Sequence, residues 1–132
     1  MRLNPKSFEA AYFYARACMA VGKNEEAVQW YERAVAVRPD DFAAMMLLGN
    51  SYTSVGRLEE STKAMRRAYD AARKHLELNP DNPRALYMGA ACLIDLGEKE
   101  KALDWTRRAE AMEPDDPSVL YNIACDYAML EM

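Results

Sequence analysis

The chain has 132 residues, of which 51% are hydrophobic, and this is enough material for one domain with a buried core. Its formal net charge of −4 disfavours nucleic acid as a partner, because an acidic domain repels a phosphate backbone. The three widely spaced cysteines, Cys18, Cys92 and Cys125, form neither a disulfide framework nor a zinc motif. We expect them to be reduced in a cytoplasmic protein. No apolar run is long enough to span a membrane.

Proline and glycine punctuate the sequence at a regular interval. Four similar proline segments occupy residues 3–7, 37–41, 78–82 and 112–116. Between them lie Gly22, Gly56 and Gly97; the first two are 34 residues apart, and the last two are 41 apart, seven more. Proline stops one helix, the Asp or Asn after it caps the next, and glycine ends that helix in a left-handed conformation. The sequence therefore predicts a repeated pair of helices.

Seven helices are expected in chain order. They cover residues 7–21, 24–37, 41–55, 58–78, 83–96, 99–112 and 117–130. Pro83 and Pro117 follow the capping residues Asn82 and Asp116 and suit the first turn of a helix. The seven extra residues fall within 70–78. Seven residues make two helical turns, so we expect a longer helix with an unchanged buried face.

Each helix has an apolar stripe at spacings of three and four. In the first helices the stripe is Ala11, Tyr14, Ala15 and Cys18, then Met45, Leu48, Gly49 and Tyr52, then Leu86, Gly89, Ala90 and Leu93. Small residues align in columns, which are Ala15, Gly49, Ala90 and Ala124, then Ala27, Ser61 and Ala102, then Ala34, Ala68 and Ala109. Two helices approach closely where one of them has almost no side chain, so we expect these columns to lie at helix crossings.

The last helix has no second helix to pair with. Its stripe is Leu120, Ile123, Ala124 and Tyr127, which we expect to pack backward on the preceding pair. Asp126 is expected on its polar outer face, and an apolar strip that includes Leu130 is expected to stay open. Such strips mark interaction sites.

The repeat resembles a known family. Met45-x2-Leu48-Gly49-x2-Tyr52, Ala27-x3-Tyr31 and Pro39 are similar to the tetratricopeptide signature of W-x2-L-G-x2-Y, A-x3-F and P. The signature tryptophan is absent from every repeat. The resemblance implies an all-α solenoid that winds as a right-handed superhelix. It would form one domain over residues 1–132, with repeats at about 8–41, 42–82 and 83–116 and a terminal helix at 117–130.

Catalytic chemistry is weakly represented. His75 is the single histidine, and neither a nucleophile nor an orienting group is placed to work with it. The acidic pairs are explained by helix capping. We therefore predict a protein that is not an enzyme and has no metal or cofactor. A basic stripe along the long helix is interpreted as a solvated face, with a docking patch for an acidic partner as the alternative. Its residues are Lys63, Arg66, Arg67, Arg73 and Lys74.

The resemblance implies that the first helices line a concave groove. Residues beside the packed stripes are expected there, and these are Tyr12, Arg16, Met46, Asn50, Arg84, Tyr87 and Tyr121. Tyrosine and methionine suit a peptide track, since tyrosine is rigid with a polar tip and methionine is adaptable. Alternatively, these residues pack against the next repeat. A clamp for a C-terminal carboxylate is not expected, because Leu47 and Met88 stand where such clamps have polar residues.

The predicted function is a protein-interaction scaffold that binds a peptide or an extended segment in this groove, as a module of a larger protein. The alternative is a self-association element that forms a homodimer through Tyr127 and Leu130 of the last helix. An RNA-binding helical repeat is less favoured, because Arg16 and Arg84 are the only basic residues expected in the groove.

Overall fold

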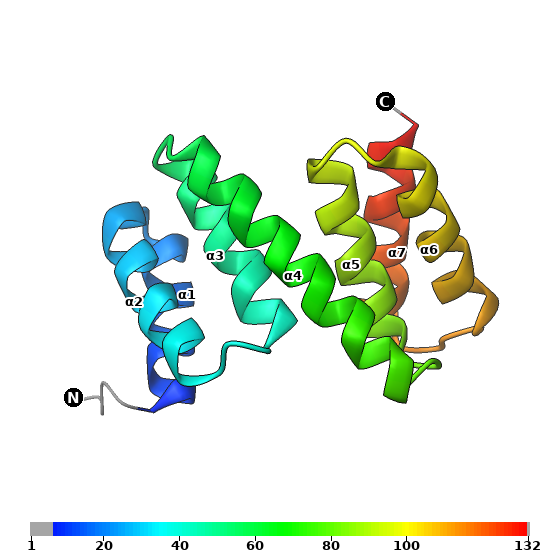
Figure 1. Cartoon of the computed structure of the whole chain (residues 1–132), viewed down its shortest axis with the longest axis horizontal. Helices are drawn as coiled ribbons and strands as arrows, with labels where there is room; N and C mark the ends of the chain where they lie inside the picture. The colour runs from blue at the N-terminus through cyan, green and yellow to red at the C-terminus, as the bar shows by residue number, and fades with distance from the viewer. Residues whose placement is uncertain (1–6, 132) are drawn as a thin grey trace. The chain divides into compact units, whose positions relative to one another are not determined.

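In the computed structural model, residues 7–131 are described, and their regular structure is entirely helical. The helices are α1 (Phe8–Ala20), α2 (Asn24–Val37), α3 (Phe42–Ser54), α4 (Leu58–Leu78), α5 (Pro83–Asp95), α6 (Lys99–Ala111) and α7 (Pro117–Leu130) (Figure 1). The predicted all-α class is confirmed, and each predicted helix end lies within one residue of the observed one. The seven extra residues lengthen α4 to 21 residues, as expected.

The chain folds as two compact units, one up to Ala64 and one from Met65 onward, with the boundary inside α4. The single domain predicted over residues 1–132 stays a prediction. The units share the same helix-start and helix-end chemistry. Asp41, Asn82 and Asp116 accept hydrogen bonds from backbone N–H groups in the first turns of α3, α5 and α7, at 2.9, 3.0 and 2.8 Å. The repeated glycines adopt positive φ angles of 79–82°, which glycine tolerates at a helix end.

In the first unit, α1 packs against α2, and α2 packs against α3. Three of the small residues predicted at helix crossings are fully buried here, namely Ala15, Ala27 and Ala34. Where α3 meets the start of α4, the Ser61 hydroxyl donates a 2.8 Å hydrogen bond to the Gly49 carbonyl oxygen and lies 2.7 Å from the Thr53 hydroxyl. These bonds satisfy polar groups in a close helix contact.

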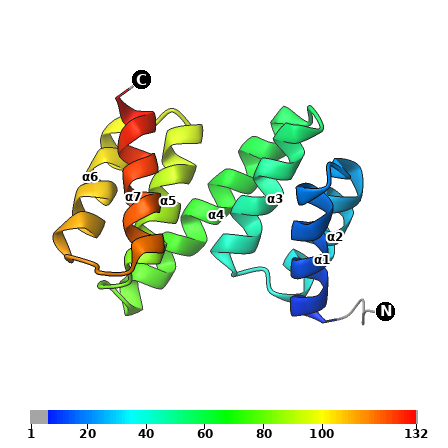
Figure 2. The ribbon, with the colours of Figure 1, turned by 180° about the vertical axis from the view of Figure 1, so that it is seen from behind.

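The second unit is built around the contact of α5 with α6, and α7 packs against both of these helices (Figure 2). The Trp105 ring packs against Gly89 so closely that a Cβ atom at Gly89 would overlap it. The same ring also packs against Tyr69 of α4 in a tilted arrangement, with centroids 5.1 Å apart and an angle of 41° between the ring planes. Gly89 thus makes room for the largest side chain in the α5–α6 contact.

We predict that Gly89→Ala destabilises the protein by about 1–3 kcal/mol, because the added methyl group overpacks the Trp105 contact. In an ordinary helix interior, the same change would stabilise by about 1 kcal/mol. Urea denaturation measures the difference. Repeating the substitution in a Trp105→Leu background should remove most of the cost, since the clash partner is gone. A Gly89→Ala variant that is more stable than the parent would contradict this contact.

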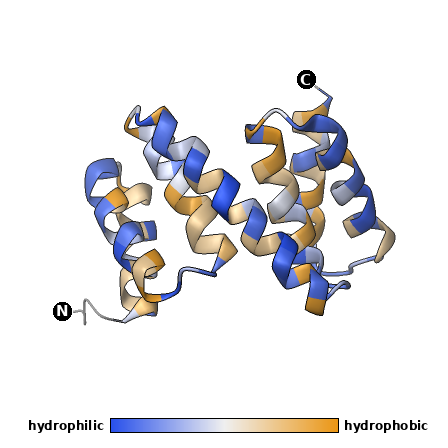
Figure 3. Cartoon of the chain, viewed as in Figure 1, coloured by the Kyte–Doolittle hydropathy of each residue, from blue (hydrophilic) through white to orange (hydrophobic). Residues whose placement is uncertain are grey.

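The prediction of which face of α7 is buried is wrong, because the helix is rotated about its axis relative to the expected orientation. Leu120 is 47% exposed, and Ala124 is exposed as well, whereas Ile123 and Asp126 are buried. The stripe of the earlier first helices faces the second helix of the same repeat. No helix among residues 7–131 covers the equivalent face of α7, and α7 instead buries the face that touches α5 and α6. In Figure 3, α7 contains many hydrophobic residues, whereas the visible side of the neighbouring α6 is largely hydrophilic.

Candidate functional site

A hollow of about 370 Å³ lies in the first unit, where α1, α2 and α3 meet. Its lining residues are Arg16, Met19, Ala20, Tyr31, Leu47 and Asn50. Arg16 and Asn50 are two of the residues predicted for the groove, and the structure brings them together here. The hollow combines an apolar lining with a few polar groups, which is the usual composition of a binding site.

The buried stripes determine which residues reach the hollow. On α1, Ala15 and Cys18 pack in the core, and successive helical residues point about 100° apart. Arg16 and Met19, each one position later, therefore turn away from the core. The same displacement from the buried Gly49 places Asn50 at the surface of α3. The amphipathic pattern that builds the core thus also presents these side chains to the hollow.

Aromatic rings support the polar side of the hollow. The Tyr12 ring stacks on Phe8, with centroids 5.5 Å apart, and meets Tyr31 edge-on at 6.3 Å. The Arg16 guanidinium lies over the Tyr12 ring, 5.8 Å from its centroid, where the ring face attracts the cation. Tyr12 is half-buried. It therefore acts here as a support for Arg16 as well as a surface residue.

Tyr31 lines the hollow from α2, and its side chain is neutral. The residue is 2% exposed, and burial, with a smaller effect of Tyr12, raises the pKa of its phenol to about 12. The positive charge of Arg16 acts on this pKa in the opposite direction. The hydroxyl therefore stays protonated near neutral pH and is available to donate a hydrogen bond.

The remaining predicted groove residues are not part of this hollow. Met46 is half-buried in the first unit. In the second unit, Tyr87 is buried, which leaves little of its ring for a partner, and its hydroxyl interacts with the exposed Arg84. Tyr121 on α7 is 70% exposed. A role for these four residues in binding remains a prediction.

Tyr31 was expected only as the aromatic residue of the repeat signature and not as part of a site. A signal was available. The family signature has phenylalanine in A-x3-F, and this chain has tyrosine at that position. A hydroxyl added at a core position needs a hydrogen-bond partner or contact with solvent. That requirement indicated an opening next to Tyr31.

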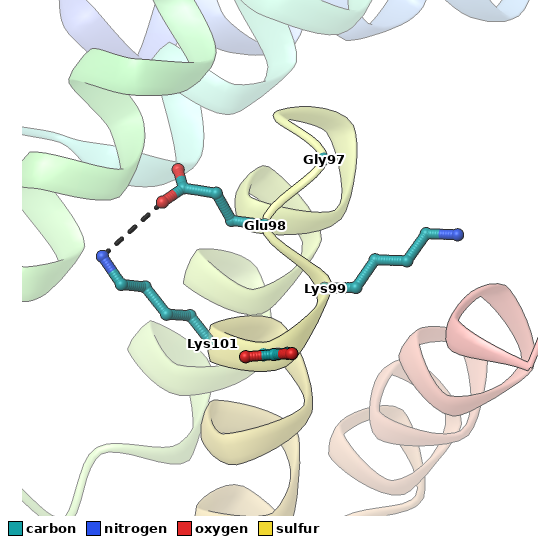
Figure 4. Close-up of a pocket in the computed structure, with 5 residues that line it drawn as sticks. Gly97, Glu98, Lys99 and Lys101 are labelled. Carbon is teal, nitrogen blue, oxygen red and sulfur yellow. Dashed lines mark ion pairs between the residues drawn. The ribbon is translucent and has the colours of Figure 1, made fainter.

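A second hollow, of about 430 Å³, lies at the start of α6 and is lined by residues 97–101 (Figure 4). Glu98 pairs there with Lys101 at 3.5 Å and with Arg66 at 2.8 Å. In the close-up, the Lys99 side chain points away from Glu98 and Lys101 (Figure 4). Glu98 and Lys101 already neutralise each other at this hollow, so it is a weaker candidate site than the hollow beside Tyr31.

Among residues 7–131, no group of three or more His, Cys, Asp or Glu side chains is placed to hold a metal ion. None of the helices described combines the length and the apolar character needed to cross a membrane. His75 is half-buried, and its Nε2 atom lies 2.8 Å from the Asn82 side-chain amide.

Comparisons with known proteins identify the family. Residues 23–109 match the family model described as anaphase-promoting complex, cyclosome, subunit 3, and residues 1–41 match a tetratricopeptide repeat model. The chain belongs to the tetratricopeptide-repeat family, which is in general a protein-interaction fold.

Among curated relatives, the Vi polysaccharide export protein VexE of Salmonella typhi is 36% identical over 84% of this chain and 16% of its own length. Superkiller protein 3 of Saccharomyces cerevisiae is 30% identical over 62% of this chain and 5% of its own length. The chain therefore spans only a small part of these relatives.

Solved structures share the fold. The Yersinia enterocolitica type III secretion chaperone SycD, in complex with a peptide of the translocator YopD, aligns with a TM-score of 0.60 and 20% identity, over 93% of this chain and 88% of SycD. The TPR2B domain of yeast Sti1, in a complex with pHsp70, aligns with a TM-score of 0.62 and 18% identity, over 94% of this chain and 95% of that one. At this identity, the likeness concerns the fold.

Proposed function

We propose that this chain is a protein-interaction module that binds a peptide or an extended segment of a partner protein on the face formed by its first helices. We also propose that it acts in the cytoplasm as one scaffold module of a larger protein. The relatives, which are several times longer than the matched region, support the second proposal.

The observation that carries the proposal is the hollow between α1, α2 and α3. It is lined by side chains of two first helices, and it places two predicted groove residues beside apolar neighbours. SycD and the TPR2B domain, which share the fold, are described in complexes with peptide or protein partners. A flexible peptide loses conformational entropy on binding. We therefore expect modest affinity, with a Kd of about 1 μM.

Selection from a random peptide library displayed on phage tests the proposal. Peptides enriched on the intact chain are synthesised with acetylated and amidated ends, and their affinity is measured by fluorescence polarisation. Asn50→Ala and Met46→Ala should each weaken binding by about 1–2 kcal/mol if these residues contact the peptide. Gln29→Ala, at an exposed position of α2, is the control and should leave the affinity unchanged. Failure to enrich any peptide would count against the proposed function.

Self-association through α7 is the second candidate function, and the exposure of Leu120 and Tyr121 favours it. The residues predicted for this contact are less suitable, because the Tyr127 hydroxyl already donates a hydrogen bond to Glu110 at 2.8 Å and Leu130 is half-buried. If copies pair through this face, light scattering after size-exclusion chromatography will show a dimer. Leu120→Glu combined with Tyr121→Glu would then give a monomer. A monomeric parent at high concentration would eliminate this alternative.

A further inference from the structure

The polar groups around the hollow in the first unit can all donate hydrogen bonds, and one of them is positively charged. Arg16 supplies a guanidinium, Tyr31 a phenolic hydroxyl and Asn50 an amide, while the lining residues include no carboxylate. The Arg16 guanidinium is a permanent cation that can only donate hydrogen bonds. The Tyr31 hydroxyl and the Asn50 amide can each donate a hydrogen bond as well. The hollow is thus electrostatically suited to an anion.

Arg16 lacks a carboxylate partner within residues 7–131, and its guanidinium lies over the Tyr12 ring. Two other arginines of the first unit are neutralised, since Arg38 pairs with Glu9 at 2.8 Å and Arg57 pairs with Glu60. The cation–π contact orients the Arg16 guanidinium and leaves its N–H groups available. An arginine fork of this kind binds carboxylates by two parallel hydrogen bonds.

Tyr31 provides the second indication. It stands where the family signature has phenylalanine, and among the described residues its hydroxyl has no hydrogen-bond partner. Asp126 Oδ2, and not the Tyr31 hydroxyl, is the polar side-chain atom buried without a partner among residues 7–131, so the Tyr31 hydroxyl is open to solvent. A ligand oxygen in the hollow can accept a hydrogen bond from it in place of water, and the raised pKa keeps the hydroxyl proton in place to be donated.

The apolar lining residues, Met19, Ala20 and Leu47, distinguish among anionic side chains. A glutamate has two methylene groups, which can contact these residues while its carboxylate reaches the donors. An aspartate is one methylene shorter, and each buried methylene contributes about 0.8 kcal/mol.

We propose that this hollow binds a glutamate side chain within the partner's peptide segment, with its carboxylate held by Arg16, the Tyr31 hydroxyl and Asn50. This inference rests on the proposed peptide-binding function and names the chemistry that the partner must have. It concerns an internal side chain and therefore does not require a free C-terminus.

The test uses the capped peptides obtained from the phage selection. We expect them to share one glutamate position. Replacing that glutamate by glutamine should weaken binding about ten- to a hundredfold, which corresponds to a charge-assisted hydrogen bond of roughly 1.5–3 kcal/mol. Replacement by aspartate should cause a smaller loss, of about fourfold.

Three protein variants localise the effect. Arg16→Gln and Tyr31→Phe should weaken binding of the glutamate peptide and leave the affinity for its glutamine counterpart almost unchanged. Tyr31→Phe restores the residue of the family signature, so it should fold normally, as circular dichroism would verify. Arg33→Gln is the matched control, because Arg33 is also exposed and lies 4.5 Å from the Trp30 ring centroid. It should have no effect.

Peptides that bind the chain and lose affinity with Asn50→Ala or Met46→Ala, but have no required acidic position, would overturn this inference and leave the proposed function standing. Equal sensitivity of the glutamate and glutamine peptides to Arg16→Gln would also overturn it. If the library yields no binding peptide, both the inference and the proposed function fail.

Discussion

Asp126→Ser will raise the free energy of unfolding at pH 8 and reduce its dependence on pH. Asp126 is 4% exposed, and its Oδ2 atom is buried without a hydrogen-bond partner in the described part of the chain. Burial raises the pKa of this carboxyl from 3.8 to about 7. A carboxylate in this position is therefore less stable than one in water.

The sign of the effect follows from the raised pKa. Below about pH 4, the carboxyl is protonated in both states and costs little. Between about pH 4 and 7, the unfolded chain releases the proton while the folded chain retains it, so stability falls as the pH rises. Above about pH 7 the full penalty is present. At 1.36 kcal/mol per pKa unit, it amounts to at most roughly 4 kcal/mol.

Serine is the appropriate replacement, because the repeat supplies a precedent. The residue equivalent to Asp126 in α3 is Ser51, which is fully buried and donates a 2.7 Å hydrogen bond to the Leu48 carbonyl oxygen. A serine at position 126 can make the same bond to the carbonyl of Ile123. The neighbouring α5 has Cys92 at this position, and burial raises the pKa of its thiol, with smaller contributions from the negative charges of Asp95 and Asp126.

Urea denaturation at several pH values between about 4.5 and 8.5 measures this prediction, with the slope m monitored so that only stability changes are compared. The parent should lose stability over this range more steeply than Asp126→Ser. Asp104→Ser, at an exposed position of α6, is the control and should follow the parent. Parallel pH profiles for the parent and Asp126→Ser would show that the carboxyl finds a partner or water in solution.

Most of the helical framework can be predicted from the sequence because its signals are local. A proline, a capping Asp or Asn and a glycine at a positive φ angle are each short-range features, and Asp41, Asn82 and Gly56 illustrate them. The lengthened α4 was also predictable, since seven residues preserve the helical phase. The orientation of α7 was not predictable in this way. It depends on which faces of α5 and α6 are left open, and Asp126 was consequently placed on the wrong side.

The candidate site was partly predictable for a related reason. Arg16 and Asn50 follow directly from the buried stripes of α1 and α3, because each is one position after a core residue. Tyr31 reaches the hollow from α2, across a helix contact that sequence periodicity does not encode. Tyr87 illustrates the opposite error. Like Tyr12, it comes one position after a residue of a packed stripe, yet it is buried in the second unit. Periodicity within one helix does not predict this burial.

Ala90→Leu will destabilise the protein strongly, whereas Ala124→Leu will have almost no effect. Both alanines occupy the same position of the repeat, in α5 and α7. Ala90 is fully buried where α5 packs against α6, and Ala124 is exposed on the face of α7 that no helix among residues 7–131 covers. Three added carbon atoms at Ala90 must displace a well-packed helix, which costs about 1–3 kcal/mol or more. At Ala124 the same atoms enter solvent, and leucine and alanine are both strong helix formers.

Thermal and urea melts of the two variants, followed by far-ultraviolet circular dichroism, give the comparison, and the paired design cancels the intrinsic effect of an alanine-to-leucine change. A loss of stability for Ala124→Leu similar to that for Ala90→Leu would mean that the open face of α7 is covered in solution. The comparison therefore also reports on self-association. If another copy covers this face, Ala124→Leu should change stability in a manner that depends on protein concentration, because dissociation is then coupled to unfolding. A stability that is independent of concentration would leave the face open to solvent.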